Sequence, residues 1–145
     1  MAAPVSGFVY KRPSITINAE DATCYFRKFN VEPDQEFVDD SGYCSGPNAE
    51  IPGGVTWLST GEVRMSYNVA TDVGAWEFFH ALSGQAVEFV VTPGPDPVSA
   101  ENPSATFTAW VPQIAFMPDH DPGSTTTYEL EFRIVGEPVF DTGGL

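Results

Sequence analysis

Two histidines are the first residues to consider for chemistry, because imidazole can serve as a general base or as a metal ligand. His80 follows Phe79 inside a predicted helix, where a packed structural role is favoured. His120 stands between Asp119 and Asp121, and these three side chains together would suit a divalent cation. Adjacent side chains alternate in direction and rarely converge on one ion, so a turn is favoured there. Neither histidine predicts a catalytic centre or a metal site.

The remaining reactive residues do not form a catalytic motif either. Cys24 and Cys44 belong to no CxxC pair, and two free thiols are favoured over a disulfide, which stays open as an alternative. Nucleophile elbows and phosphate-binding glycine loops are absent from the sequence. Asp39 and Asp40 do not begin a calcium loop, because the required glycine at the sixth position is missing. We therefore expect no enzymatic activity and no cofactor.

Net charge excludes one large class of function. The chain has 20 acids, six bases and a net charge of −14, and no base lies between Met65 and Phe132. Specific nucleic-acid binding needs cationic contacts to phosphates, so we do not expect it. Two interpretations of the acidity stay open. One is solubility, and the other is a wall along which nucleic acid passes without binding.

The length of 145 residues suits a single domain, which we assign to residues 1–145, with a flexible arm at 1–12 and a tail at 141–145. No apolar run reaches the ~20 residues of a membrane span. The N-terminus lacks the charged region and apolar core of a signal peptide. We expect a protein that is neither exported nor bound to a membrane.

The first half of the chain predicts strands with one long interruption. Residues 14–18 and 23–33 are rich in β-branched and aromatic residues, and further strands are expected at 55–59 and 62–70, with a turn near Thr60 and Gly61. In the second strand, strict alternation would place Tyr25, Arg27 and Phe29 on one face.

Between these strands, residues 34–54 are acidic and contain several Gly and Pro residues, which predicts a loop. Loops near twenty residues are uncommon in compact domains and are usually functional. Phe37, Val38 and Tyr43 are apolar residues that a solvated linker would not need. An interaction arm is therefore slightly favoured over a passive loop.

The second half predicts one helix among strands. Residues 72–84 carry Val73, Trp76, Phe79 and Leu82 at helical spacing, with Asp72 as N-cap and Gly84 at the end. Strands are expected at 85–93, 105–118 and 125–138, and Pro112 implies a bulge, bend or edge in the second of them. One helix cannot cover both faces of a sheet. The fold class is mostly β, an antiparallel β-sandwich or barrel flanked by one short α-helix, with an apolar face left for another sheet or subunit.

Three segments carry a resemblance to a known family. They are ITINAEDATCYFRKFNVEPDQEFVDDSGYCS, EVRMSYNVATDVGAWEFFHALSGQAVEFVVTP, and the final pair ATFTAWVPQIAFMP and TTTYELEFRIVGEP. In element order and texture, though without a short diagnostic motif, residues 14–140 resemble the major tail (tube) proteins of long-tailed, siphovirus-type bacteriophages, especially those of actinobacterial phages.

The resemblance implies a structural virion protein that assembles into stacked hexameric rings in the host cytoplasm and forms an acidic-lined tail tube for DNA ejection. The genomic DNA would pass through without specific binding, and other partners would be the tape measure and tail terminator proteins. In such proteins a long loop between early strands reaches the next ring, and residues 34–54 match it by position. The residues expected at that contact are Phe37, Val38, Asp39, Asp40 and Tyr43, and those expected to face the lumen are Glu129 and Glu131.

Two alternatives stay open. The first is a capsid decoration or tail-terminator protein of the same phage type. The second, from another class, is a free-standing β-sandwich that binds a small ligand or carbohydrate in a pocket lined by Trp57 or Trp110.

Overall fold

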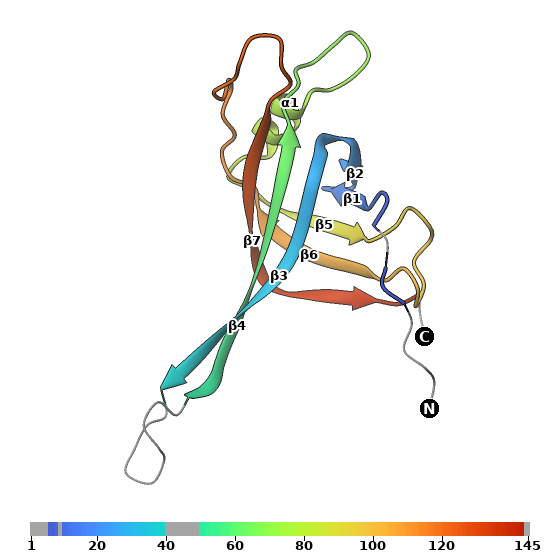
Figure 1. The fold of residues 1–145 in the computed structure, drawn as a ribbon, viewed down its shortest axis with the longest axis vertical. Coiled ribbons are helices and arrows are strands. Elements are labelled where there is room, and N and C mark those ends of the chain that lie inside the picture. Colours follow the sequence, from blue (N-terminus) through green and yellow to red (C-terminus); the bar gives the residue numbers. More distant parts are fainter. Residues whose placement is uncertain (1–5, 9, 40–49, 144–145) are drawn as a thin grey trace.

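The computed structural model describes residues 6–8, 10–39 and 50–143 (Figure 1). It confirms the predicted fold class: the protein is mostly β, with antiparallel strand pairs and one short α-helix. The strands are β1 (Ser14–Ile17), β2 (Glu20–Asp21), β3 (Phe26–Asp39), β4 (Glu50–Arg64), β5 (Ala86–Thr92), β6 (Ser104–Trp110) and β7 (Thr127–Asp141), with a short 3₁₀ turn η1 (Thr23–Tyr25) before β3 and the helix α1 (Ala75–Leu82) before β5.

The strands form one seven-stranded sheet in the order β2-β1-β5-β6-β7-β4-β3. Strand β7 joins the two parts of the sheet, β2-β1-β5-β6 and β4-β3. The first half of β7 pairs with β4 and its second half pairs with β6, so that Arg133 is opposite both Leu58 and Trp110. The register against β6 shifts between Thr106 and Thr108, near Gly136, whose φ of 77° few other residues adopt. This irregularity bends β7, so the sheet curls over its own inner face in a sandwich-like arrangement.

Aromatic rings fill the inside of the curled sheet. Phe132 of β7 lies with ring centroids 5.0 Å from Phe89 of β5 and 6.1 Å from Phe79 of α1, and all three side chains are fully buried. Phe26 and Phe29 of β3 pack against the same cluster. The core therefore holds the edge strand β3 against the strands on the far side of the sheet.

The helix is shorter than predicted, and its N-cap is Gly74 rather than Asp72. The backbone N–H of Gly74 donates to Asn68 Oδ1 and that of Ala75 to Ser66 Oγ, each at 2.9 Å. Asn68 and Ser66 thus accept the hydrogen bonds of the first backbone amides of the helix, whereas the sequence pattern predicted that Asp72 would cap it. Gly84, with φ 77°, follows the helix as predicted.

The predicted buried face of the helix is confirmed except at Val73. Of the four residues predicted at helical spacing, Phe79 is buried, and Trp76 and Leu82 are half-buried against the core, whereas Val73 precedes the helix and is exposed. Ala75 and Phe78 are buried as well. The side chain of Trp76 lies at the rim, where it stacks on His80 with ring centroids 4.7 Å apart.

Strand β4 is continuous where two strands and a turn were predicted. Thr60 and Gly61 lie in the middle of it, paired with Glu131 and Leu130 of β7. A Cβ atom on Gly61 would lie 2.4 Å from Phe26 Cε1. The glycine is therefore required for ring packing and does not mark a turn.

The strands at the C-terminal end were predicted with shifted boundaries. Strand β6 ends at Trp110, two residues before Pro112, so the proline follows the strand and does not bend it. Strand β7 extends to Asp141, which the prediction placed in the tail.

Candidate assembly surfaces

The described residues of the predicted loop 34–54 are strand, because β3 continues to Asp39 and β4 begins at Glu50. The prediction was wrong because each strand forms its hydrogen bonds with the other, and this pairing tolerates Pro52, Gly53 and Gly54 within β4. Pairing of β4 with β7 stops at Leu58. Residues 33–39 and 50–57 therefore form a two-stranded ribbon, here called the hairpin arm, which projects away from the curled sheet (Figure 1).

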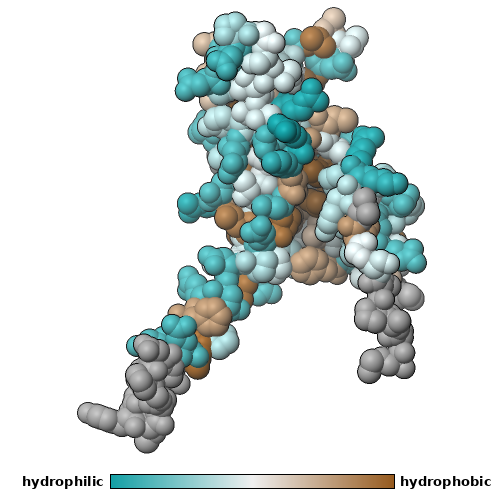
Figure 2. Space-filling model, in the orientation of Figure 1, coloured by the Kyte–Doolittle hydropathy of each residue, from teal (hydrophilic) through white to brown (hydrophobic). Residues whose placement is uncertain are grey.

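Apolar side chains are exposed on both faces of the hairpin arm. Phe37, which is opposite Pro52, is 61% exposed, while Val38 and Ile51 form the next cross-strand pair and are also exposed. Figure 2 shows this apolar surface interleaved with polar residues along the arm. A two-stranded ribbon is marginally stable alone, and clustered exposed apolar groups mark contact sites. The arm is thus suited to enclosure by another protein surface.

The predicted contact residues fall on this arm as far as they are described. Phe37, Val38 and Asp39 are exposed at the outer end of β3. Asp40 and Tyr43 lie outside the described residues. The sequence prediction missed the β4 side of the arm, above all Ile51 and Val55. Both are β-branched residues of the kind that favours strands, but the Pro and Gly residues between them obscured this signal.

The base of the arm is held by an aromatic contact. The ring centroids of Trp57 on β4 and Phe140 on β7 are 5.7 Å apart. Val135 and Val139, also on the second half of β7, are exposed apolar residues as well.

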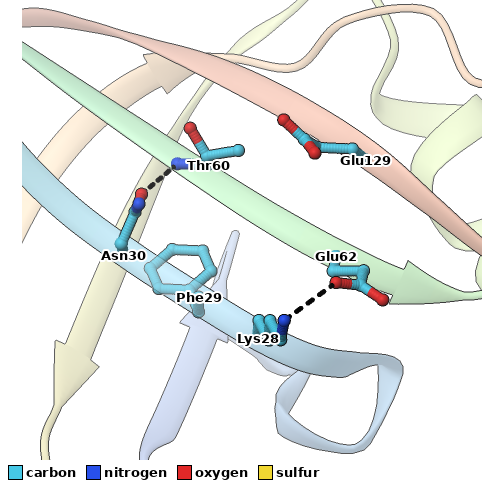
Figure 3. Close-up of a pocket in the computed structure, with 6 residues that line it drawn as sticks. All are labelled: Lys28, Phe29, Asn30, Thr60, Glu62 and Glu129. Carbon is cyan, nitrogen blue, oxygen red and sulfur yellow. Dashed lines mark hydrogen bonds and ion pairs between the residues drawn. The ribbon is translucent and has the colours of Figure 1, made fainter.

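Glu129 and Glu131, predicted to face a lumen, lie side by side on the outer face of the sheet. Glu129 is directly opposite Glu62 of β4, and both line a shallow groove with Lys28 (Figure 3). Glu62 also lies 3.9 Å from Lys28 Nζ, and Arg133 Nε lies 3.7 Å from Glu131. This face is acidic but carries bases at its margins.

The other residues that were considered for chemistry lie on different elements of the fold. In the part of the chain that the structure describes, no three His, Cys, Asp or Glu side chains are grouped as metal ligands. His120 is exposed, with Nδ1 3.0 Å from the carbonyl of Pro118. Trp57 packs on Phe140, and Trp110 is half exposed on β6.

Cys24 is exposed and forms no disulfide with any described residue. Cys44 lies outside the described residues. The described residues include no helix with the length and apolarity needed to cross a bilayer.

No protein-family model matches the chain, and no curated protein does.

Proposed function

We propose that this protein is a structural, non-enzymatic subunit that self-assembles into the stacked hexameric rings of a phage tail tube. One observation carries the proposal. The hairpin arm extends beyond the sheet and exposes apolar side chains on both faces, at the position where the family resemblance implies a contact between rings. In this account Phe37 and Val38 bury against the neighbouring ring.

The curled sheet supports the same conclusion. Strand β3 is the last strand in the order, so among the described strands nothing pairs with its outer edge. Exposed edges of this length promote aggregation unless they are covered, and ring closure is one way to cover them. The acids Glu129 and Glu131 on the outer face would suit a wall along which DNA slides, because such a wall offers few counterion-releasing contacts.

A deletion of residues 36–50 tests the role of the arm. We expect the variant to keep the thermal transition of the core but to form no tubes, since the deleted residues lie beyond the last β4–β7 pair. The double variant Phe37→Ser, Val38→Ser should weaken assembly without shortening the arm. Val69→Ser and Val73→Ser, at two comparably exposed apolar residues in another segment, serve as the matched control. Normal tubes from the deletion variant would contradict the proposal.

The alternative functions predict assemblies other than a tube. A decoration protein would bind capsids as a monomer or trimer, and a terminator would form one ring that never stacks. A ligand-binding sandwich would stay a monodisperse monomer.

A further inference from the structure

Five of the six bases of this acidic chain come together in one groove. Lys11, Arg12, Arg27, Lys28 and Arg64 all line a depression of about 340 Å³, here called the basic groove. The sixth base, Arg133, is on β7. The bases come from the segment before β1, from β3 and from the end of β4, so it is the fold that gathers them.

The geometry of β3 explains how two adjacent bases reach the same side. The register against β4 shifts between Phe26 and Lys28, which places Arg27 in a bulge. As a result Phe26 and Phe29 both pack inward, and Arg27 and Lys28 both reach Glu62, at 3.5 and 3.9 Å. The strict alternation predicted for this strand is therefore wrong.

The groove lies between the two ends of the sheet. Ile15 of β1 lines one side, while Phe26 and Phe29 of the edge strand β3 line the other. It adjoins a larger groove of about 750 Å³, which Lys11 and Lys28 also line and which runs along β3 past β5 and β6. The site thus offers a strand edge that no described strand pairs with, beside a row of cations, which suits an extended acidic segment.

The positive charge of the groove is only partly neutralised within the chain. Arg27 and Lys28 share the single carboxylate of Glu62. Arg12 interacts electrostatically with Asp21. Among the described residues no ion pair involves Lys11 or Arg64. In a chain of net charge −14, a surface with this excess of cations favours an anionic partner.

The same chain carries a matching acidic segment. No base occurs from Phe29 to Val63, and on the hairpin arm Asp34, Glu36 and Glu50 are all exposed. The arm cannot reach its own groove, because Lys28 and Asp34 lie on one extended strand and are separated by about 20 Å at ~3.3 Å per residue. The contact must therefore be made between two copies. Nucleic acid is disfavoured as the occupant because the overall charge repels it.

We infer that the basic groove binds the acidic hairpin arm of a second copy of this chain. The hairpin arm and the basic groove are different surfaces of the chain, so the contact is heterologous and propagates into rings or filaments. The inference rests on the proposed self-assembly and adds its acceptor site. It also makes assembly dependent on ionic strength, since these charge pairs are screened by salt.

Charge reversal tests the pairing directly. A groove variant, Lys11→Glu with Arg12→Glu, changes residues outside the strands and should leave the fold intact. An arm variant, Asp34→Lys with Glu36→Lys, reverses the proposed partner. By sedimentation velocity in low salt, each variant alone should self-associate about tenfold more weakly than wild type or worse. An equimolar mixture should recover association, because each copy then meets an opposite charge. Arg133→Glu and the pair Asp119→Lys, Asp121→Lys are the matched controls and should behave as wild type.

Cys24 gives a readout local to the groove, since its thiol lies there with Arg12 Nη2 3.7 Å away. In a Cys44→Ser background, maleimide labelling of Cys24 should slow when wild-type chains associate. If wild type and both variants all form tubes, and association does not slow the labelling of Cys24, the inference is wrong and the proposed function stands. If wild type never associates, both the inference and the proposed function are wrong. If a fluorescent 20-base-pair duplex binds wild type but not the groove variant, the occupant is nucleic acid and the inference is overturned.

Discussion

Trp57 and Phe140 pack together, with ring centroids 5.7 Å apart, and thereby join the base of the hairpin arm to the end of the bent strand β7. Beyond this contact the arm is a ribbon of two strands. The direction in which the arm leaves the sheet is therefore set at Trp57. A subunit that must place its arm on a neighbour needs such a fixed direction, because a loosely held arm would lose more conformational entropy on binding.

Removing the indole should loosen the arm and leave the core folded. For Trp57→Ala we expect a loss of about 1 kcal/mol in the free energy of unfolding, together with weaker assembly. Urea denaturation and sedimentation velocity measure the two effects. Trp57→Phe, which keeps a ring against Phe140, is the control and should retain assembly. Equal assembly by Trp57→Ala and wild type would show that the contact does not orient the arm.

Gly61 should not tolerate a side chain. A Cβ there would lie 2.4 Å from the ring of Phe26 and 3.3 Å from that of Phe29. Gly61→Ala should therefore destabilise the protein by about 1–3 kcal/mol, the usual cost of overpacking. Gly54→Ala is the control, because a Cβ at Gly54 meets nothing within 4 Å. Thermal unfolding of both variants checks this, and equal melting temperatures would contradict the packing role.

The cross-strand pair of Glu62 and Glu129 should be repulsive. Like charges directly opposite each other destabilise a sheet, so Glu129→Gln should stabilise the protein by about 0.2–1 kcal/mol. High salt should reduce the gain, since the repulsion is exposed to solvent. Glu131→Gln, which instead loses the contact with Arg133, should bring no gain. Denaturant titrations at low and high salt distinguish these outcomes, and a destabilised Glu129→Gln variant would refute the prediction.

Asp21 should give stability a specific pH dependence. Hydrogen bonds from Thr23 Oγ1 and the Thr23 backbone N–H, at 2.7 and 3.0 Å, lower the pKa of Asp21 below its ordinary value of 3.8. A carboxyl group whose pKa is lower in the folded state stabilises the fold above its unfolded pKa, and this contribution is lost as the pH falls through the folded pKa. Asp21→Asn should therefore be less stable than wild type at pH 7, with a gap that closes in acid. Asp119→Asn is the control, and an Asp21→Asn gap that is constant with pH would contradict the assignment.

The parts of the fold that local pattern determines were predictable. Strand β5 follows from an apolar run, the aromatic helix from its spacing, and β6 and β7 from two further segments that read as strands. The arm was missed because its strands hold each other across the hairpin, and this pairing overrides the local effect of Pro52 and Gly53. In the same way, Gly61 looked like a turn residue because the rings that require it, Phe26 and Phe29, are more than thirty positions away.

The basic groove could not be predicted from the sequence. Lys11, Lys28 and Arg64 are far apart in the chain and look like scattered surface bases in an acidic protein. They meet only because the sheet curls until β1 and β3 approach each other. The exposed positions of Phe37 and Val38 on the arm agree with the sequence interpretation, while their contact with a neighbouring ring stays a prediction.

Electron microscopy of the purified protein shows directly whether it assembles into a tube. At high protein concentration and low salt, we predict hollow tubes built from stacked rings, with sixfold symmetry in end-on averages and a regular axial repeat. A chain that stays monomeric under these conditions, even after addition of preformed tube fragments as seeds, would contradict the account.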